Sequence, residues 1–296
     1  MFLPSVILFL LWKENRMSKE RIDKILSHQG FGSRKDVKKL LRASQVLVNG
    51  QRIYDAGFTI DAEKDVLTVD DEEISLQANR YIMMNKVMHT ISANKDGLHQ
   101  TVFDLLSEDL RTPYLQEKLH LVGRLDMDTE GLLLFTTDGE LTHRLISPKT
   151  HISKTYFCVL EHSETDEHKQ EIARLFKEGI EVGPDDNEPG FKCEPATIKW
   201  ATEDEFNLHT NKSSVLEALS SAGVSFNAEN AQNQVALLTI YEGKYHQVKR
   251  MFAAVGNKVV FLKRISVGKL ELDKTLEPGK YRELLEEEIN KLILPI

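Results

Sequence analysis

The sequence predicts an α+β protein in which a small basic domain precedes a larger domain with a central, mostly antiparallel sheet. The chain has 296 residues, of which 41% are hydrophobic, and this is enough to build two separate cores. After about residue 80 the sequence has many short strand patterns and few long helical ones, which is typical of an antiparallel sheet covered by helices. We therefore expect domains at 17–76 and 80–296.

Charge is distributed unevenly along the chain. The formal net charge is -8 at pH 7, which disfavours a protein that coats nucleic acid indiscriminately. Nine lysines or arginines and three acids nevertheless lie within 19–52, and six lysines or arginines and no acid lie within 244–264. Two basic stretches on an acidic chain indicate directed contacts with a polyanion.

A short apolar N-terminal segment and a low cysteine content bear on where the protein is located. The apolar run within residues 1–16 is too short to span a bilayer and has neither a basic leader nor a small-residue cleavage site. We expect 1–16 to be disordered, or to precede a true start at Met17, rather than to anchor the chain in a membrane. Cys158 and Cys193 lack partners at zinc spacing, which favours a reducing cytoplasm and predicts no disulfide and no metal site.

The first domain begins with two predicted helices. Ile22, Ile25 and Leu26 lie at helical spacing, and the glycines around residue 31 end this helix. Ser33 is placed to cap a second helix over 34–42, whose lysines would face outward.

A hairpin is predicted to follow these helices. Asn49-Gly50 is a strong two-residue hairpin signal, and it separates apolar strands expected at 46–48 and 51–53. Another strand is expected at 65–69, and the acidic segment 70–79 is predicted to be the linker to the second domain.

The second domain is predicted from alternating and periodic apolar patterns. Strands are expected at 81–85, 132–135, 156–160, 199–209, 235–241 and 259–267. Helices are expected at 141–146, 166–178, 214–221 and, after a turn, within 243–255. The segment 211–233 is rich in Ser, Asn and Ala and is predicted to be an insertion.

The segment 121–156 is predicted to gather chemically useful side chains. We expect a short apolar strand to end on Arg124 and Asp126, so that a rigid backbone holds the carboxylate toward solvent. Lys154 and Tyr156 open the next strand, and the fold is expected to return them to the same neighbourhood.

Three motifs follow one another along the second domain: 123–132 reads G-R-L-D-x-x-T-x-G-L, 154–156 reads K-T-Y, and 242–252 reads E-G-K-Y-H-Q-V-K-R-M-F. Together they resemble the three motifs of the RsuA-type RNA pseudouridine synthases. Residues 17–76 resemble the S4 RNA-binding domain through R-x-D-K, the S-R cap and V-x-V-N-G. Tyr245-His246-Gln247 stands where most relatives have Asn-Arg-Gln, and this is most similar to members that act on 16S rRNA.

This resemblance implies an isomerase that converts a specific uridine of 16S rRNA, of the site 516 type, to pseudouridine. It implies that Asp126 is the nucleophile, adding either to the sugar C1′ or to the uracil C6. Lys249 would be its cation, with Arg250 as the alternative, and Tyr156 would stack on the target base and help to remove the C5 proton.

The resemblance and the charge pattern together give a set of expected RNA contacts. The basic residues assigned to RNA are Arg21, Arg34, Lys35, Lys38, Arg42, Arg124, Lys154, Lys244 and Arg250. The expected partner is 16S rRNA or a small-subunit assembly particle, bound by a monomer in the cytoplasm. No metal or cofactor is expected, because the isomerisation requires neither redox chemistry nor an energy source.

Three alternative functions remain open on the sequence alone. A D-x-D-x-T phosphatase would use Asp126 and Asp128, but Thr129 stands one position too early for that motif. A pseudouridine synthase for a 23S rRNA uridine would carry the same three motifs. A non-catalytic RNA-binding protein of ribosome assembly would keep the fold without turnover.

Overall fold

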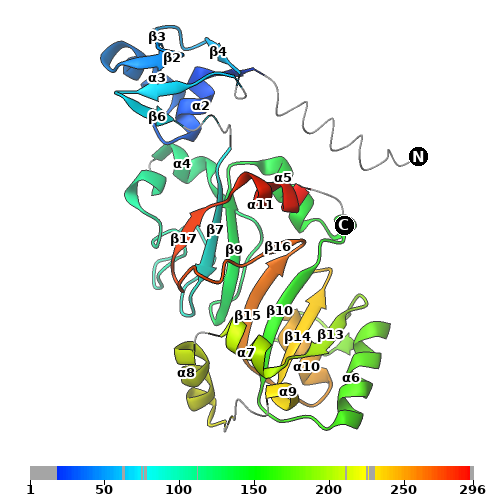
Figure 1. Cartoon of the computed structure of the whole chain (residues 1–296). Helices are drawn as coiled ribbons and strands as arrows, with labels where there is room; N and C mark the ends of the chain where they lie inside the picture. Colours follow the sequence, from blue (N-terminus) through cyan, green and yellow to red (C-terminus); the bar gives the residue numbers. More distant parts are fainter. Residues whose placement is uncertain are drawn as a thin grey trace, which may run out of the picture.

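The structure is a computed structural model that describes residues 19–293 except 62–63, 75, 77–78, 112, 211, 225 and 227–230. The expectation about residues 1–16 lies outside the described residues. Figure 1 shows a small N-terminal module at one end of the molecule and a larger domain beyond it. No helix in the described part of the chain has both the length and the apolar character that a membrane span requires.

The N-terminal module packs two helices on a four-stranded sheet. The helices are α2 (Ile22–His28) and α3 (Arg34–Ala43), and the strand order is β3-β2-β5-β6. Its strands are β2 (Val46–Val48), β3 (Gln51–Arg52), β5 (Leu67–Val69) and β6 (Glu72–Ile74), with β1 (Glu20–Arg21) and β4 (Thr59–Ile60) paired separately. Ser33 caps α3, as the sequence predicts, and Asp36 completes a capping box with it.

Strand β6 corrects the prediction that 70–79 is only a linker. It pairs antiparallel with β5, with Asp70 and Asp71 between them. Both aspartates have positive φ angles, of 50° and 72°, which is the backbone of a tight two-residue hairpin turn. The acidic composition suggested a solvated tether, but aspartate also tolerates this conformation, and the turn returns the chain to the sheet.

The larger domain is built on a nine-stranded sheet. Its main path has the order β13-β14-β10-β15-β9-β7-β17, and β8 and β16 pair with β9 and β15. The strands are β7 (Tyr81–Lys86), β8 (His120–Leu121), β9 (Thr129–Thr136), β10 (Lys154–Leu160), β13 (Thr197–Trp200), β14 (Val235–Ile240), β15 (Val259–Val267), β16 (Leu270–Glu271) and β17 (Tyr281–Glu283). Neighbouring strands run antiparallel except β15 and β9, which are parallel, so the expected mostly antiparallel α+β fold is confirmed.

Helices and short connections cover the sheet. They are η1 (Glu108–Arg111), α4 (Pro113–Lys118), α5 (Gly139–Ile146), η2 (Pro148–Thr150), α6 (Asp166–Glu178), α7 (Glu203–His209), α8 (Lys212–Ala222), α9 (Ala231–Gln234), α10 (Gln247–Ala254) and α11 (Glu286–Ile293). A two-stranded hairpin of β11 (Glu181–Val182) and β12 (Phe191–Lys192) stands apart from the sheet.

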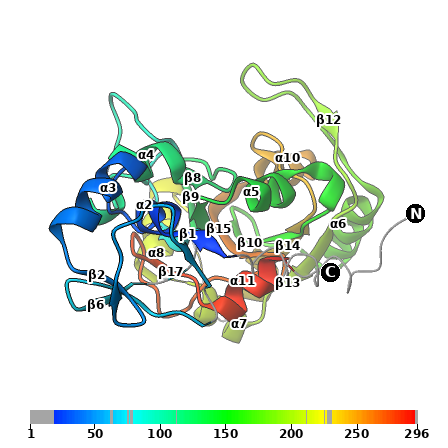
Figure 2. The same ribbon diagram turned by 90° about the horizontal axis from the view of Figure 1, so that it is seen from above.

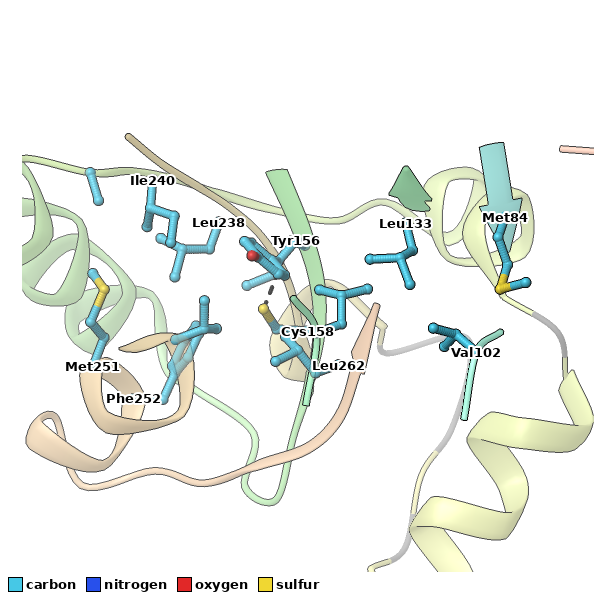
Figure 3. Packing of buried hydrophobic residues seen from close by; sticks show 14 of the residues in the cluster. Met84, Val102, Leu133, Tyr156, Cys158, Leu238, Ile240, Met251, Phe252 and Leu262 are labelled. Carbon is cyan, nitrogen blue, oxygen red and sulfur yellow. Dashed lines mark hydrogen bonds between the residues drawn. The ribbon is translucent and has the colours of Figure 1, made fainter. Parts of the chain in front are cut away.

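Alternate residues of a strand pack into separate hydrophobic cores on the two faces of the sheet. Along β7, Ile82 and Met84 enter one core, while Tyr81 and Met83 enter another. Figure 3 shows the first of these cores, with Met251 and Phe252 of α10 on one side of Tyr156 and with Met84 on the other. Helix α10, which carries most of the third motif, is therefore fixed against the strand that carries Tyr156.

The segment 199–209, expected to be one strand, divides into the end of β13 and helix α7. Thr202 caps α7, and Glu205 completes a capping box by accepting from the Thr202 backbone. The alternation of polar and apolar residues hid this local signal. The prediction of a helix at 214–221 is confirmed, since α8 spans Lys212–Ala222.

Gly131 allows β9 and β15 to approach each other closely. Its φ angle is 100°, and a Cβ atom at this position would overlap the carbonyl oxygen of Arg264. A side chain here would separate the two parallel strands. The glycine of the first motif therefore positions the loop that immediately precedes β9.

Candidate active site

Asp126 lies in the loop 122–128, between β8 and β9. The expected strand ending at Asp126 is shorter than predicted, because only His120–Leu121 forms β8. Ser92 holds the residue before Asp126: its hydroxyl donates to the Leu125 carbonyl at 2.7 Å and accepts from the Leu125 amide at 3.1 Å. The backbone of the loop is thus fixed by hydrogen bonds rather than by strand pairing.

Lys86 fixes the C-terminal end of this loop. Its side chain is fully buried at the end of β7. The ammonium donates to the carbonyls of Thr129 at 2.9 Å, Val87 at 3.2 Å and Met127 at 3.3 Å. Burial lowers the pKa of Lys86 to about 8, partly opposed by the nearby carboxylates of Asp128, Glu130 and Asp126. The three ammonium protons therefore fix the chain on both sides of Asp128.

Lys249 of α10 supplies a cation to the Asp126 carboxylate. The Lys249 ammonium lies 3.2 Å from Asp126 Oδ2 and 2.6 Å from Asp128 Oδ1. His246 Nε2 lies 3.8 Å from the same Asp126 oxygen. About 35% of the Asp126 side chain is exposed, so the carboxylate stays accessible to a bound molecule.

A pocket of about 500 Å³ opens over Asp126. Its wall includes Tyr156, which is 8% exposed, and the apolar side chains Leu125, Ile240 and Leu262. Figure 3 places Tyr156 of β10 among the apolar residues of this wall. The lining combines aromatic rings, a few convergent polar groups and apolar surface, which is the composition expected of a binding site for a planar organic group.

The pocket brings together the three residues expected to be catalytic, Asp126, Tyr156 and Lys249. Arg124 and Lys244 lie on its rim and are exposed. The five residues of the N-terminal module that are expected to contact RNA are exposed on that module: Arg21, Arg34, Lys35, Lys38 and Arg42.

Two other expected RNA contacts point elsewhere. The Arg250 side chain is buried and donates to the carbonyls of Gly183 and Pro189, so it holds the hairpin loop 183–190 instead of facing the pocket. Lys154 is half-buried and donates to the Ile152 carbonyl, and burial, with the charge of Arg264, lowers its pKa to about 8. Spacing along the chain could not reveal these contacts. Arg250 bonds a loop that is distant in the sequence, and Lys154 is partly buried by the packing of the sheet.

Sequence reasoning missed four contributors to the site. These are Lys86, Ser92, His246 and the loop 183–190. Two of them give a sequence signal: Lys86 ends the strand pattern of β7, and His246 lies within the third motif.

Comparisons with known proteins agree with this geometry. A family model described as RNA pseudouridylate synthase matches residues 80–254, and an S4 domain model matches residues 20–67. The chain is 40% identical to YtzG, an uncharacterized RNA pseudouridine synthase of Bacillus subtilis, over 93% of this chain and 99% of that protein. It is 38% identical to ribosomal small subunit pseudouridine synthase A of Vibrio cholerae, over 91% and 97% of the two chains.

Two further matches extend over nearly the whole chain. The enzyme of the same name from Escherichia coli K12 is 36% identical, over 92% of this chain and all of that protein. A crystal structure of a pseudouridylate synthase superposes with a TM-score of 0.54 at 33% identity and covers 92% of this chain. The resemblance inferred from the three motifs is confirmed. The chain is a member of the RsuA-like family of RNA pseudouridine synthases, isomerases that here carry an N-terminal S4 domain.

Proposed function

We propose that this enzyme converts one uridine of 16S rRNA, of the site 516 type, to pseudouridine, with Asp126 as its nucleophile. The observation that carries the proposal is the Asp126 carboxylate, which is held between Lys249 and His246 at the floor of the pocket. Relatives named for the ribosomal small subunit, 34% to 38% identical over most of the chain, support the choice of RNA.

The reaction breaks the bond from N1 of uracil to the sugar and forms a bond from C5 to the same carbon. The Asp126 carboxylate adds to the sugar C1′ or to the uracil C6, and it leaves when the new bond is complete. C5 loses its proton and N1 gains one, so the overall change is an isomerisation. The chemistry assigned to Asp126 and Tyr156 needs no metal or cofactor.

Tyr156 is proposed to hold the uracil while it rotates. Its ring lies in the pocket wall on β10, between the neighbouring strands β14 and β15, so its position is rigid. A detached base must stay close to the sugar, and the apolar wall of the pocket restricts its escape and excludes water. As a phenolate, the Tyr156 oxygen would accept the C5 proton, and N1 gains a proton in the product.

Replacing Lys249 by methionine is expected to lower the rate of pseudouridine formation by about 10-fold, which corresponds to about 1.4 kcal/mol. The change removes the ammonium that lies 3.2 Å from Asp126 and 2.6 Å from Asp128. The single-turnover rate measures this effect. Lys249→Arg keeps the charge and is the control, with an expected rate within about threefold of wild type. Equal rates for Lys249→Met and wild type would show that Lys249 does not contribute to catalysis.

The exposed face of α3 is proposed to bind the RNA backbone. Changing Arg34 and Lys38 together to alanine is expected to weaken RNA binding and to reduce the slope of log Kd against log salt by about 1.5 to 2. Lys177→Ala, which removes an exposed cation from α6, is the control and should leave the slope unchanged. A slope equal to that of wild type in the double variant would argue against this surface.

The RNA target is tested by tritium release from rRNA labelled at uridine C5. With 16S rRNA or small-subunit particles, in EDTA, we expect release by the wild-type enzyme. Release from 23S rRNA alone would assign the enzyme to the large subunit. Tight binding of 16S rRNA without release would favour a binding protein of ribosome assembly.

We also propose that the enzyme acts as a monomer in the cytoplasm, where rRNA is assembled into subunits. The proposed domain division at 17–76 and 80–296, with an insertion at 211–233, would let the N-terminal module hold the RNA while the larger domain modifies it.

A further inference from the structure

Two neighbouring aromatic rings lie on the rim of the pocket. The rings of Tyr245 and His246 are stacked, with centroids 3.8 Å apart and an interplanar angle of 25°. Tyr245 is 40% exposed, although it is a large aromatic residue next to the site. His246 lies between it and Asp126, with Nε2 3.8 Å from the carboxylate. One ring of the pair thus faces the reacting atoms and the other faces solvent.

Hydrogen bonds fix the edges of both rings. The Tyr245 hydroxyl donates to Asp186 Oδ2 at 2.7 Å, and His246 Nδ1 lies 2.8 Å from Asp185 Oδ2. The bond to Asp186 and burial raise the pKa of Tyr245 to about 12, so the phenol stays protonated and keeps donating. Both aspartates belong to the loop 183–190, whose hairpin extends from the body of the molecule beside α10 in Figure 2.

The loop that holds the rings is itself anchored to the third motif. Arg250 donates to the carbonyls of Gly183 at 2.5 Å and Pro189 at 2.6 Å, near the two ends of the loop. Its guanidinium and the Lys244 ammonium both lie over the ring of Phe191. Arg250 therefore anchors the loop whose aspartates hold the two rings.

His246 also has a strained backbone. Its φ angle is 48°, in the left-handed region, at the position that caps α10. A side chain other than glycine adopts this conformation at a cost, and such residues often mark functional sites. Here the conformation places the imidazole between Asp185 and Asp126.

We propose that the Tyr245–His246 pair is a stacking platform for the nucleobase next to the target uridine. This inference rests on the proposed RNA substrate. When the uridine leaves its stack, its neighbour loses a partner, and a fixed aromatic face next to the pocket replaces it. The exposed face of Tyr245 is the surface that this base would cover.

The charges around the rings favour a base over a phosphate at this position. Asp185, Asp186 and Glu188 all belong to the same loop, and their carboxylates repel the RNA backbone. Phosphates are instead expected along the cations Arg124 and Lys244 on the rim. A neutral aromatic face beside an acidic loop is thus suited to a π-stacked base.

The platform is tested with an RNA fragment that spans the uridine at which the wild-type enzyme makes pseudouridine. The base on either side of that uridine is replaced in turn by 2-aminopurine, whose fluorescence falls when it stacks. The protein carries Asp126→Asn so that the RNA is not consumed. We expect strong quenching at one of the two positions, and its loss in the additional variant Tyr245→Leu.

Tyr245→Phe and Tyr54→Leu are the matched controls. Tyr245→Phe keeps the ring without its bond to Asp186, so quenching is expected to be retained. Tyr54→Leu removes a tyrosine that is 63% exposed on the N-terminal module, and quenching should be unchanged. In an otherwise wild-type enzyme, Tyr245→Leu is expected to raise KM by about 10-fold to 100-fold, with kcat within about threefold.

Three results would overturn the inference. Quenching that is equal in Tyr245→Leu and its parent would show that the ring does not stack on the neighbouring base. A fall in kcat with unchanged KM would assign Tyr245 to the chemistry instead. Asp185, Asp186 and His246 also bring ligand atoms within 4.8 Å of one another, so quenching that requires Mn²⁺ and disappears in EDTA would assign this cluster to a cation. A wild-type enzyme without turnover would refute the proposed function itself.

Discussion

Replacing Asp126 by asparagine is expected to reduce the single-turnover rate of pseudouridine formation by about 10⁴-fold or more. The amide keeps the size and shape of the carboxylate but is a poor nucleophile, so the covalent step is lost. Tritium release from rRNA labelled at uridine C5 measures the rate. Residual turnover near that of wild type would remove Asp126 from the mechanism.

The fold and RNA binding of Asp126→Asn are expected to be unchanged. The side chain of Asp126 does not hold the loop, since Ser92 and Lys86 bind its neighbours through backbone atoms. Lys249 keeps a second carboxylate, Asp128, at 2.6 Å. Asp128→Asn is the matched control: it removes a partner of the same ammonium, and we expect a rate within about 10-fold of wild type.

Replacing Lys86 by methionine is expected to destabilise the fold by about 2 kcal/mol and to lower the rate by about 100-fold. Methionine has a similar length but no donor, so the carbonyls of Val87, Met127 and Thr129 lose the ammonium. Val87 keeps the Thr90 hydroxyl as a donor, and Met127 keeps the His89 amide. Removal of a buried charge offsets part of this loss. Urea unfolding measures the first effect, and single-turnover kinetics measures the second. Unchanged stability would show that the fold does not depend on the ammonium as a donor to these carbonyls.

The pH dependence of Lys86 has opposite signs for stability and for activity. The pKa falls from 10.5 in the unfolded chain to about 8 in the fold. Between these pH values the unfolded chain binds more protons, so this group makes the free energy of unfolding rise with pH. A neutral amine has only two N–H groups for three carbonyls, so the reaction rate is expected to fall above pH 8.

Comparison of wild type with Lys86→Met isolates these effects. Lys154 also has a pKa lowered to about 8 and contributes to stability with the same sign, but it is present in both proteins. The difference in unfolding free energy between the two proteins should therefore change between pH 8 and 10.5. A constant difference over this range would contradict the assigned pKa of Lys86.

The elements predicted well from the sequence are those with local signals. The helix cap at Ser33, the Asn49-Gly50 hairpin and the strand at 259–267 each depend on a few adjacent residues, and each agrees with the structure. The segment 199–209 was wrongly predicted to be a strand because the apolar alternation competed with an equally local cap at Thr202. Strand β6 was missed because its turn residues are also common in linkers.

In the candidate site too, residues with a local sequence signal were predicted, and contacts set by tertiary packing were not. Asp126, Tyr156 and Lys249 carry motif signals, and the structure brings them to one pocket, although their catalytic roles stay proposals. The contacts of Lys86, His246 and Arg250 are set by tertiary packing between β7, α10 and the loop 183–190. No spacing rule along the chain relates these segments, so sequence reasoning could not have paired them.

The most direct test of the proposed function is to map pseudouridines in 16S rRNA after reaction with wild-type enzyme and with Asp126→Asn. Chemical labelling of pseudouridine followed by primer extension locates each product at single-nucleotide resolution. We expect one new pseudouridine with the wild-type enzyme, at the site 516 type position, and none with the variant. The same product from both proteins, or no product in 16S rRNA with a product in 23S rRNA, would contradict it.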